Sequence, residues 1–125
     1  MPAEPIRAII LFGHGARDPA WAAPLLRLRD VVREGAPQAR VELAFLEFLP
    51  PSLGDLLNQL AEAGVSQIDV VPVFLAQSGH VKRDLPQILA EAGQRHPQLS
   101  IRLRHALGEA PEVIAAMAAS VLRGH

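Results

Sequence analysis

The stretch Ile9-Ile10-Leu11-Phe12-Gly13-His14-Gly15 is an apolar run that ends at a histidine held between two glycines. Its β-branched and aromatic residues predict a strand over residues 6–12 that is buried on both faces. His14 would then stand at the tip of a sheet, where Gly13 and Gly15 let a ligand approach the backbone closely. Taken alone, the stretch fits a glycine-rich turn that happens to contain a histidine equally well.

Outward from this strand, apolar residues alternate between strand-like and helical spacing. Further strands are predicted over residues 40–46, 67–75 and 100–105. Helical stripes begin near Trp21, Leu53, Val81 and Ile114. The order βαβαβαβα favours an α/β fold, a parallel sheet covered on both faces. Right-handed crossovers leave few topologies, and we predict a doubly wound four-stranded sheet of order 2-1-3-4.

Local signals refine these elements. Asp18-Pro19 supplies a helix N-cap followed by an N1 proline, and Ser52 with Asp55 resembles a capping box. Pro72 lies inside a predicted strand although it cannot donate a hydrogen bond, so we expect an irregularity there. The last helix is predicted to turn Ile114, Met117 and Val121 inward.

The totals bound what the chain can do. Its 125 residues suit a single domain over 1–125, with flexible ends at 1–5 and 123–125. A net charge of −1 gives no indication of a nucleic-acid partner, and no cysteine is present for disulfides or thiolate metal sites. With no signal pattern and no membrane-length apolar run, we expect a soluble cytoplasmic protein with no membrane partner.

Two histidines are predicted to meet at one edge of the sheet. In the order 2-1-3-4, ligands bind between strands one and three, beyond their carboxyl ends. His14 follows strand one and His80, beside Gly79, follows strand three. Neutral imidazoles suit divalent iron, cobalt, nickel or zinc, and without four ligands an open, exchangeable metal site fits best. Glu47, after strand two, is either a carboxylate at this site or a solvated residue.

Other polar residues are open to two interpretations. Arg17, Lys82 and Arg83 are solvated surface charges or a clamp for an anionic ligand. Among the other histidines, His96 suits a helix end, His105 could reach the same edge, and His125 is the last residue. No P-loop and no dinucleotide fingerprint is present, so neither a nucleotide nor an organic cofactor is expected.

Several motifs together resemble the small CbiX/SirB type of sirohydrochlorin chelatase, in the class II chelatase family. The matching segments occur in family order and cover nearly the whole chain; they are 11–19, 44–47, 51–53, 70–75, 79–82, 84–86, 106–108 and Pro111. The resemblance also accounts for Pro72, which the family pattern places there. It implies a flavodoxin-like, chelatase-like fold and a homodimer.

The resemblance further implies a lyase that inserts a divalent metal, as substrate, into sirohydrochlorin without ATP. His14 and His80 match the two metal-site histidines, and Glu47 matches an acidic position that would assist catalysis. We expect substrate contacts from Gly13, Gly15, Arg17, Gly79, Lys82 and Arg83. Cobalt for cobalamin biosynthesis is the leading expectation, then iron for siroheme, then nickel. A non-catalytic metal or tetrapyrrole carrier and an interaction module with structural histidines remain alternatives.

Overall fold

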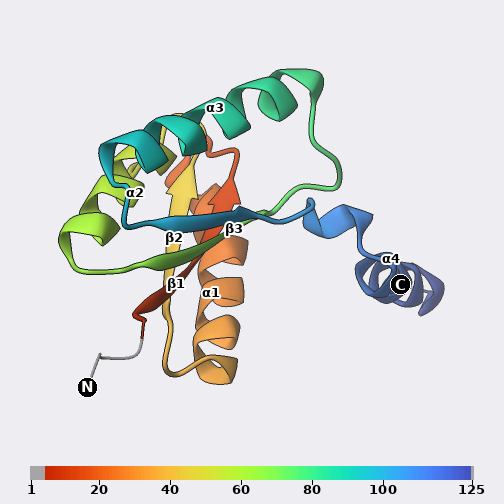
Figure 1. The fold of residues 1–125 in the computed structure, drawn as a ribbon. Helices are drawn as coiled ribbons and strands as arrows, with labels where there is room; N and C mark the ends of the chain where they lie inside the picture. Colours follow the sequence, from red (N-terminus) through yellow and green to blue (C-terminus); the bar gives the residue numbers. More distant parts are fainter. Residues whose placement is uncertain (1–4, 125) are drawn as a thin grey trace.

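The computed structural model describes residues 5–124, except the side chain of His80; of the ends predicted to be flexible, 1–5 and 123–125, residues 1–4 and 125 lie outside the described residues. Four strands form one sheet in the order β2-β1-β3-β4 (Figure 1), and each neighbouring pair is parallel. The strands are β1 (Arg7–Gly13), β2 (Arg40–Phe45), β3 (Gln67–Pro72) and β4 (Ser100–Leu103). The predicted α/β class and strand order are confirmed.

Three of the four α-helices found between residues 5 and 124 cover the sheet. Helices α2 (Leu53–Glu62) and α3 (Gly79–Arg95) lie on one face and α1 (Ala23–Gly35) lies on the other (Figure 1). Helix α4 (Pro111–Leu122) follows a short 3-10 turn, Leu107–Glu109, and stands apart from the sheet. None of the helices described between residues 5 and 124 is long and apolar enough to span a bilayer.

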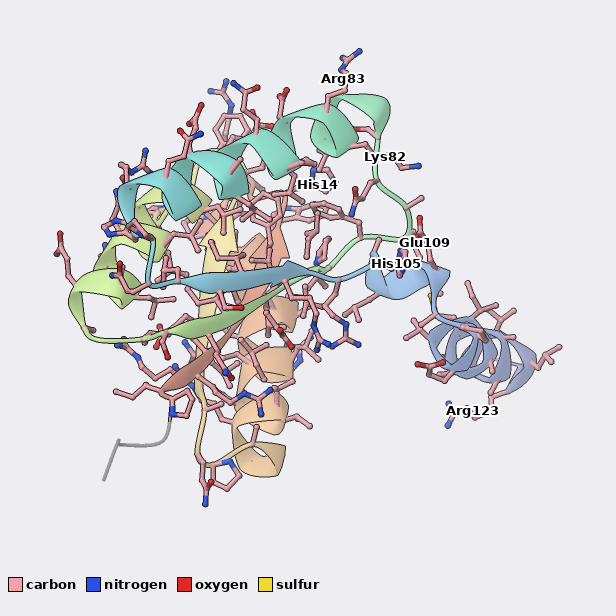
Figure 2. All side chains as sticks on the ribbon, viewed as in Figure 1. His14, Lys82, Arg83, His105, Glu109 and Arg123 are labelled. Atoms are coloured by element: carbon pink, nitrogen blue, oxygen red, sulfur yellow. The ribbon has the colours of Figure 1, made fainter. Side chains whose placement is uncertain are left out.

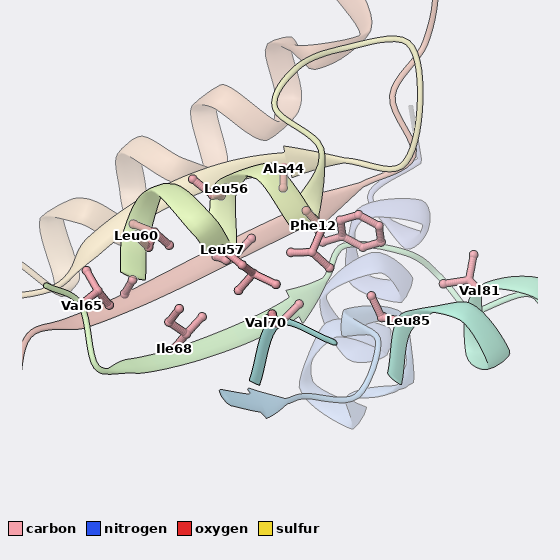
Figure 3. Packing of buried hydrophobic residues seen from close by; sticks show 14 of the residues in the cluster. Phe12, Ala44, Leu56, Leu57, Leu60, Val65, Ile68, Val70, Val81 and Leu85 are labelled. Carbon is pink, nitrogen blue, oxygen red and sulfur yellow. The ribbon is translucent and has the colours of Figure 1, made fainter. Parts of the chain in front are cut away.

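Alternation along the strands divides the core into two clusters. Ile10, Phe12 and Val70 point to the face covered by α2 and α3, where Leu57 and Leu85 are almost completely buried (Figure 3). We call this the closed face. The alternate residues of the strands point to the other face of the sheet, which α1 covers only in part. We call this the open face; its residues include Ile9, Leu11, Val41, Leu43 and Val71. A period of two places successive side chains on opposite faces of a sheet.

The predicted helix caps are present. The Ser52 side chain accepts a hydrogen bond from the Asp55 N–H at 3.2 Å, and the Asp18 carboxylate accepts one from the Ala20 N–H at 2.9 Å. Asp18 caps a 3-10 turn, Pro19–Ala22, which delays the start of α1 to Ala23. Trp21 therefore lies outside the apolar stripe of α1 and is exposed.

Pro72 is the last residue of β3, so this strand ends before the predicted Leu75. Pairing with β4 ends where the Arg104 N–H donates to the Val70 carbonyl, leaving no strand beside Pro72 on that edge. On the other edge, the ladder continues through the Val73 N–H, which donates to the Phe12 carbonyl at 2.8 Å. The missing N–H of Pro72 therefore leaves no gap in the hydrogen bonding of the sheet, because no neighbouring strand requires a donor at this position.

The expectation that α4 turns Ile114, Met117 and Val121 inward is wrong. All three are exposed, and no residue of α4 is buried. The helix forms where the sequence predicted it, but it stands apart from the sheet (Figure 1). Among the elements that the structure describes, α1 is therefore the only helix on the open face.

Candidate active site at the carboxyl end of the sheet

His14 follows the last residue of β1, as predicted, and its side chain is exposed. Its imidazole lies against the ring of Phe74, with 4.2 Å between ring centroids and 33° between planes. Phe74 is buried and meets Phe12 edge-on, with 5.8 Å between centroids. Packing on a ring that is anchored in the core orients the imidazole while its side chain stays open to a ligand.

The loops after β1 and β2 are joined through their backbones. The Leu46 N–H donates to the Gly13 carbonyl at 2.9 Å, and the Glu47 N–H donates to the His14 carbonyl at 3.1 Å. Gly15 has a φ of +83°, and a Cβ there would clash with the Glu47 carbonyl oxygen. Glycine is therefore required at position 15 by this crossing of two loops. The crossing brings His14 and the exposed Glu47 to the same edge of the sheet, at the carboxyl ends of the strands. We call this edge, with the loops that follow the strands there, the rim.

His80 lies in the first turn of α3 and not in the preceding loop as expected. The Ser78 side chain caps this helix by accepting a hydrogen bond from the Val81 N–H at 3.3 Å. Since β3 is the neighbour of β1, the start of α3 belongs to the same end of the sheet as His14. Among the described side chains, which leave out His80, no group of three histidines or carboxylates is arranged to hold a metal ion.

The other two predicted glycines differ in their surroundings. Gly13 is buried, and a Cβ there would come within 3.1 Å of the Leu25 side chain, so helix packing alone accounts for glycine. Gly79 faces open space, with no atom near its notional Cβ. A role for either residue in substrate contact stays a prediction.

The three predicted basic residues are not gathered around His14. The Arg17 guanidinium lies 4.9 Å from the centre of the Phe48 ring, and Phe48 sits in the loop after β2 with a φ of 70°. Lys82 and Arg83 are exposed on α3 and extend outward, away from His14 (Figure 2). Arg17 is therefore the basic residue that the structure ties to the rim loops.

The remaining histidines lie elsewhere. His96 ends α3, where its Nε2 lies 2.9 Å from the Asn58 Oδ1. His105 follows β4 and its side chain is almost fully exposed, with its Nδ1 3.9 Å from a Glu109 carboxylate oxygen. His125 is outside the described residues.

Sequence reasoning missed two apolar residues of this rim, Phe74 and Leu75. Phe74 supports the imidazole from below, and Leu75 beside it is largely exposed. The Gly108 N–H donates to the Phe74 carbonyl at 2.8 Å and so ties the loop after β4 to the same place. The available signal was an aromatic residue just beyond a central strand, at the edge where His14 was expected.

An open parallel sheet of order β2-β1-β3-β4 defines a doubly wound α/β protein, and proteins of this class bind their ligands beyond the carboxyl ends of the strands. The chain matches the CbiX family model over residues 8–123, and it belongs to the CbiX family. The resemblance in the sequence motifs is thereby confirmed.

Individual relatives agree with this assignment. The chain is 39% identical over 82 residues to a sirohydrochlorin cobaltochelatase of Methanopyrus kandleri, covering 66% of this chain and 57% of the relative. It is 36% identical over 84 residues to one of Methanococcus aeolicus, covering 67% and 59%. The matches thus span less than two thirds of these relatives' length.

Solved structures share the fold. A Marinobacter aquaeolei protein described as a CbiX protein of cobalamin biosynthesis superposes with a TM-score of 0.81 at 30% identity, covering 94% of this chain and 95% of that one. The sirohydrochlorin chelatase SirB of Bacillus subtilis subspecies spizizenii, solved with cobalt, gives 0.80 at 25%, covering 95% and 51%. The chelatase-like fold is confirmed.

Proposed function

We propose that this protein is a lyase that inserts a divalent metal ion into the tetrapyrrole sirohydrochlorin without ATP. The observation that carries the proposal is the exposed His14 imidazole, which a buried Phe74 ring supports at the tip of a central strand. Imidazole nitrogen is a ligand of intermediate softness that binds first-row transition metals. An exposed imidazole can therefore hold such a metal ion and still release it. The similarity to cobaltochelatases supports sirohydrochlorin as the acceptor.

Metal insertion makes modest chemical demands. Bonds form between the metal and the ring nitrogens, and two N–H bonds break, so two protons leave for each divalent ion inserted. His14 and His80 present the metal and accept protons as they release it, and Glu47 assists as a carboxylate base. No nucleophile, nucleotide or organic cofactor is needed.

A flat, polyanionic tetrapyrrole also needs a surface to rest on. Phe48 and Leu75 are exposed apolar side chains in the loops after β2 and β3. Arg17, held over Phe48, is the cation best placed to meet a substrate carboxylate. Lys82 and Arg83 serve as outer contacts for carboxylates that reach beyond the rim, and Gly13, Gly15 and Gly79 leave the backbone accessible.

Cobalt is the proposed metal, in cobalamin biosynthesis. Relatives named cobaltochelatases and a SirB structure with cobalt support this choice. Imidazole ligands bind iron and nickel as well, so ferrochelatase activity for siroheme is the outcome to test against it. We further propose that the protein acts in the cytoplasm as a homodimer.

The proposal is tested by mixing protein, sirohydrochlorin and Co²⁺ without oxygen and following the absorption change. Insertion should exceed the uncatalysed rate, and His14→Ala and His80→Ala should each reduce it at least about a hundredfold, the usual range for removing an acid-base group. His96→Gln is the matched control, because His96 lies at the other end of α3. Stoichiometric metal or tetrapyrrole binding without faster insertion would identify a carrier instead.

A further inference from the structure

The open face of the sheet carries an apolar groove of about 770 Å³. Ile9, Leu11 and Val71 form part of it from the sheet, and Leu28 and Val32 contribute from α1. In a doubly wound sheet a second helix normally covers such a floor, because parallel sheets are buried on both faces. Here the groove is open on the side that α1 does not cover.

Helix α4 is an apolar helix that is left exposed. Glu112 is the only charged residue in Pro111–Leu122, and the rest is almost entirely alanine and larger apolar residues. A helix that is apolar on nearly every side belongs in a buried setting. Yet Val121 and Leu122 are 78% and 82% exposed, and Ile114 is half exposed.

The connection to α4 explains why the helix does not cover its own groove. Pro111 to Val113 lie at the groove margin, so α4 starts there. Ala110, the residue before the helix, is extended with φ −76° and ψ 129°, and the helix that follows stands apart from the sheet (Figure 1). Twelve residues make a helix about 18 Å long, which projects beyond the chain's own surface.

We propose that a second copy of this chain occupies the groove, with α4 of each protomer packed on the open face of its partner. Groove and helix are both apolar, and neither has a partner among residues 5–124, so one two-fold operation covers both at once. The length of the SirB chain agrees, since 95% of this chain matches only 51% of that one and leaves room for a second unit. The exchange rests on the proposed homodimer and specifies its geometry, whereas the metal chemistry does not depend on it.

Paired lysine substitutions on α4 test the exchange. Met117 shares a helix face with Ile114 and Val121, whereas Ala116 lies on the side of Glu112, one turn away. Met117→Lys should weaken the dimer at least about tenfold, as expected when an interface anchor is lost, and Ala116→Lys should leave it intact. Sedimentation equilibrium measures both. A monomeric wild-type protein, or equal effects of the two substitutions, would overturn the exchange.

Directed cross-linking identifies the surfaces in contact. The chain has no cysteine, so introduced thiols are the only ones present. Chains carrying Val32→Cys and differently tagged chains carrying Met117→Cys are mixed, and a short bismaleimide should join them into a covalent heterodimer. A stable dimer without this product would show that another surface mediates association. Sirohydrochlorin metallation, assayed on the same samples, reports on the proposed activity separately.

Discussion

The two faces of the sheet are made from the same strands but are completed differently. On the closed face, α2 and α3 bury Ile10, Phe12 and Val70 almost completely. On the open face, α1 packs on Leu11 and Val41 through side chains that are themselves only partly buried. No residue of α1 is buried, whereas α2 contains five buried residues. The difference shows that residues 5–124 bury the closed face almost completely and cover the open face only in part.

The contrast separates two sources of stability. The closed face depends only on contacts inside one chain, so its contribution is the same at every protein concentration. The open face gains its last helix from a partner in the proposed dimer, and its contribution must then rise with concentration by mass action. Substitutions on the two faces therefore distinguish intrachain packing from association.

The largest effect is expected on the closed face. Leu57 is completely buried between α2 and the sheet (Figure 3), so Leu57→Ala removes packing and leaves a cavity. We expect a loss of about 2–5 kcal/mol in the free energy of unfolding. Urea denaturation followed by circular dichroism measures it. This loss of unfolding free energy should be the same in dilute and in concentrated protein. If it changed strongly with protein concentration, the stability of this core would depend on dimerisation.

Most of the fold could be predicted because local periodicity determined it. The apolar run that ends at Gly13 identified a strand, the spacing of Leu53, Leu56 and Leu60 identified a helix, and right-handed crossovers then restricted the strand order. The inward turn of α4 was wrong for a physical reason. Apolar spacing shows that a helix face needs cover, but it does not show whether the cover comes from the same chain.

The site was predictable where it depended on chain order and not where it depended on packing. His14 was placed correctly because a strand had to end at Gly13. The ring of Phe74 beneath it was not foreseen, since that contact joins two loops some sixty residues apart. The outward direction of Lys82 and Arg83 was equally inaccessible, because it depends on where the first turn of α3 begins.

The next largest effect is expected at the rim, which joins the two faces. Gly15→Ala forces an alanine into the left-handed region and against the Glu47 carbonyl. Left-handed strain together with this backbone contact should cost about 3 kcal/mol in unfolding free energy and displace Glu47 from His14. Thermal unfolding and the insertion assay measure the two consequences. Gly79 faces open space, so Gly79→Ala is the control and should change the unfolding free energy little. If both substitutions lowered stability equally, the crossing of the loops at Gly15 would not explain the loss.

A smaller effect is expected inside the groove. Val71 lies on the open face, and Val71→Ala removes two methyl groups, worth about 1–2 kcal/mol when buried. The penalty should be largest in concentrated protein, where the partner helix covers the site, and should shrink on dilution. Urea midpoints compared across protein concentrations test this. If the loss of unfolding free energy were the same at every protein concentration, the floor of the groove would contribute to stability without the partner.

The smallest effect is expected at the β4 edge of the open face, where charge replaces apolar surface. The Arg102 guanidinium donates to both Asp69 carboxylate oxygens, at 3.2 and 2.8 Å, and this carboxylate raises the pKa of Arg102. The cation therefore persists at any pH at which the protein is handled. Since the guanidinium is solvated, the pair should add little to stability, and salt should weaken it further.

Arg102→Ala should therefore leave both the unfolding midpoint and the sedimentation behaviour unchanged. The reason is that the proposed footprint of α4 is the apolar part of the groove, which Val71 and Leu11 line and Arg102 does not. Arg104 does line the groove and lies 3.9 Å from Asp69, so Arg104→Ala is the informative companion. A weaker dimer in Arg104→Ala alone would set the boundary of the footprint between these two arginines. A weaker dimer in Arg102→Ala would extend it to the edge strand, and the open face would then be covered across its whole width.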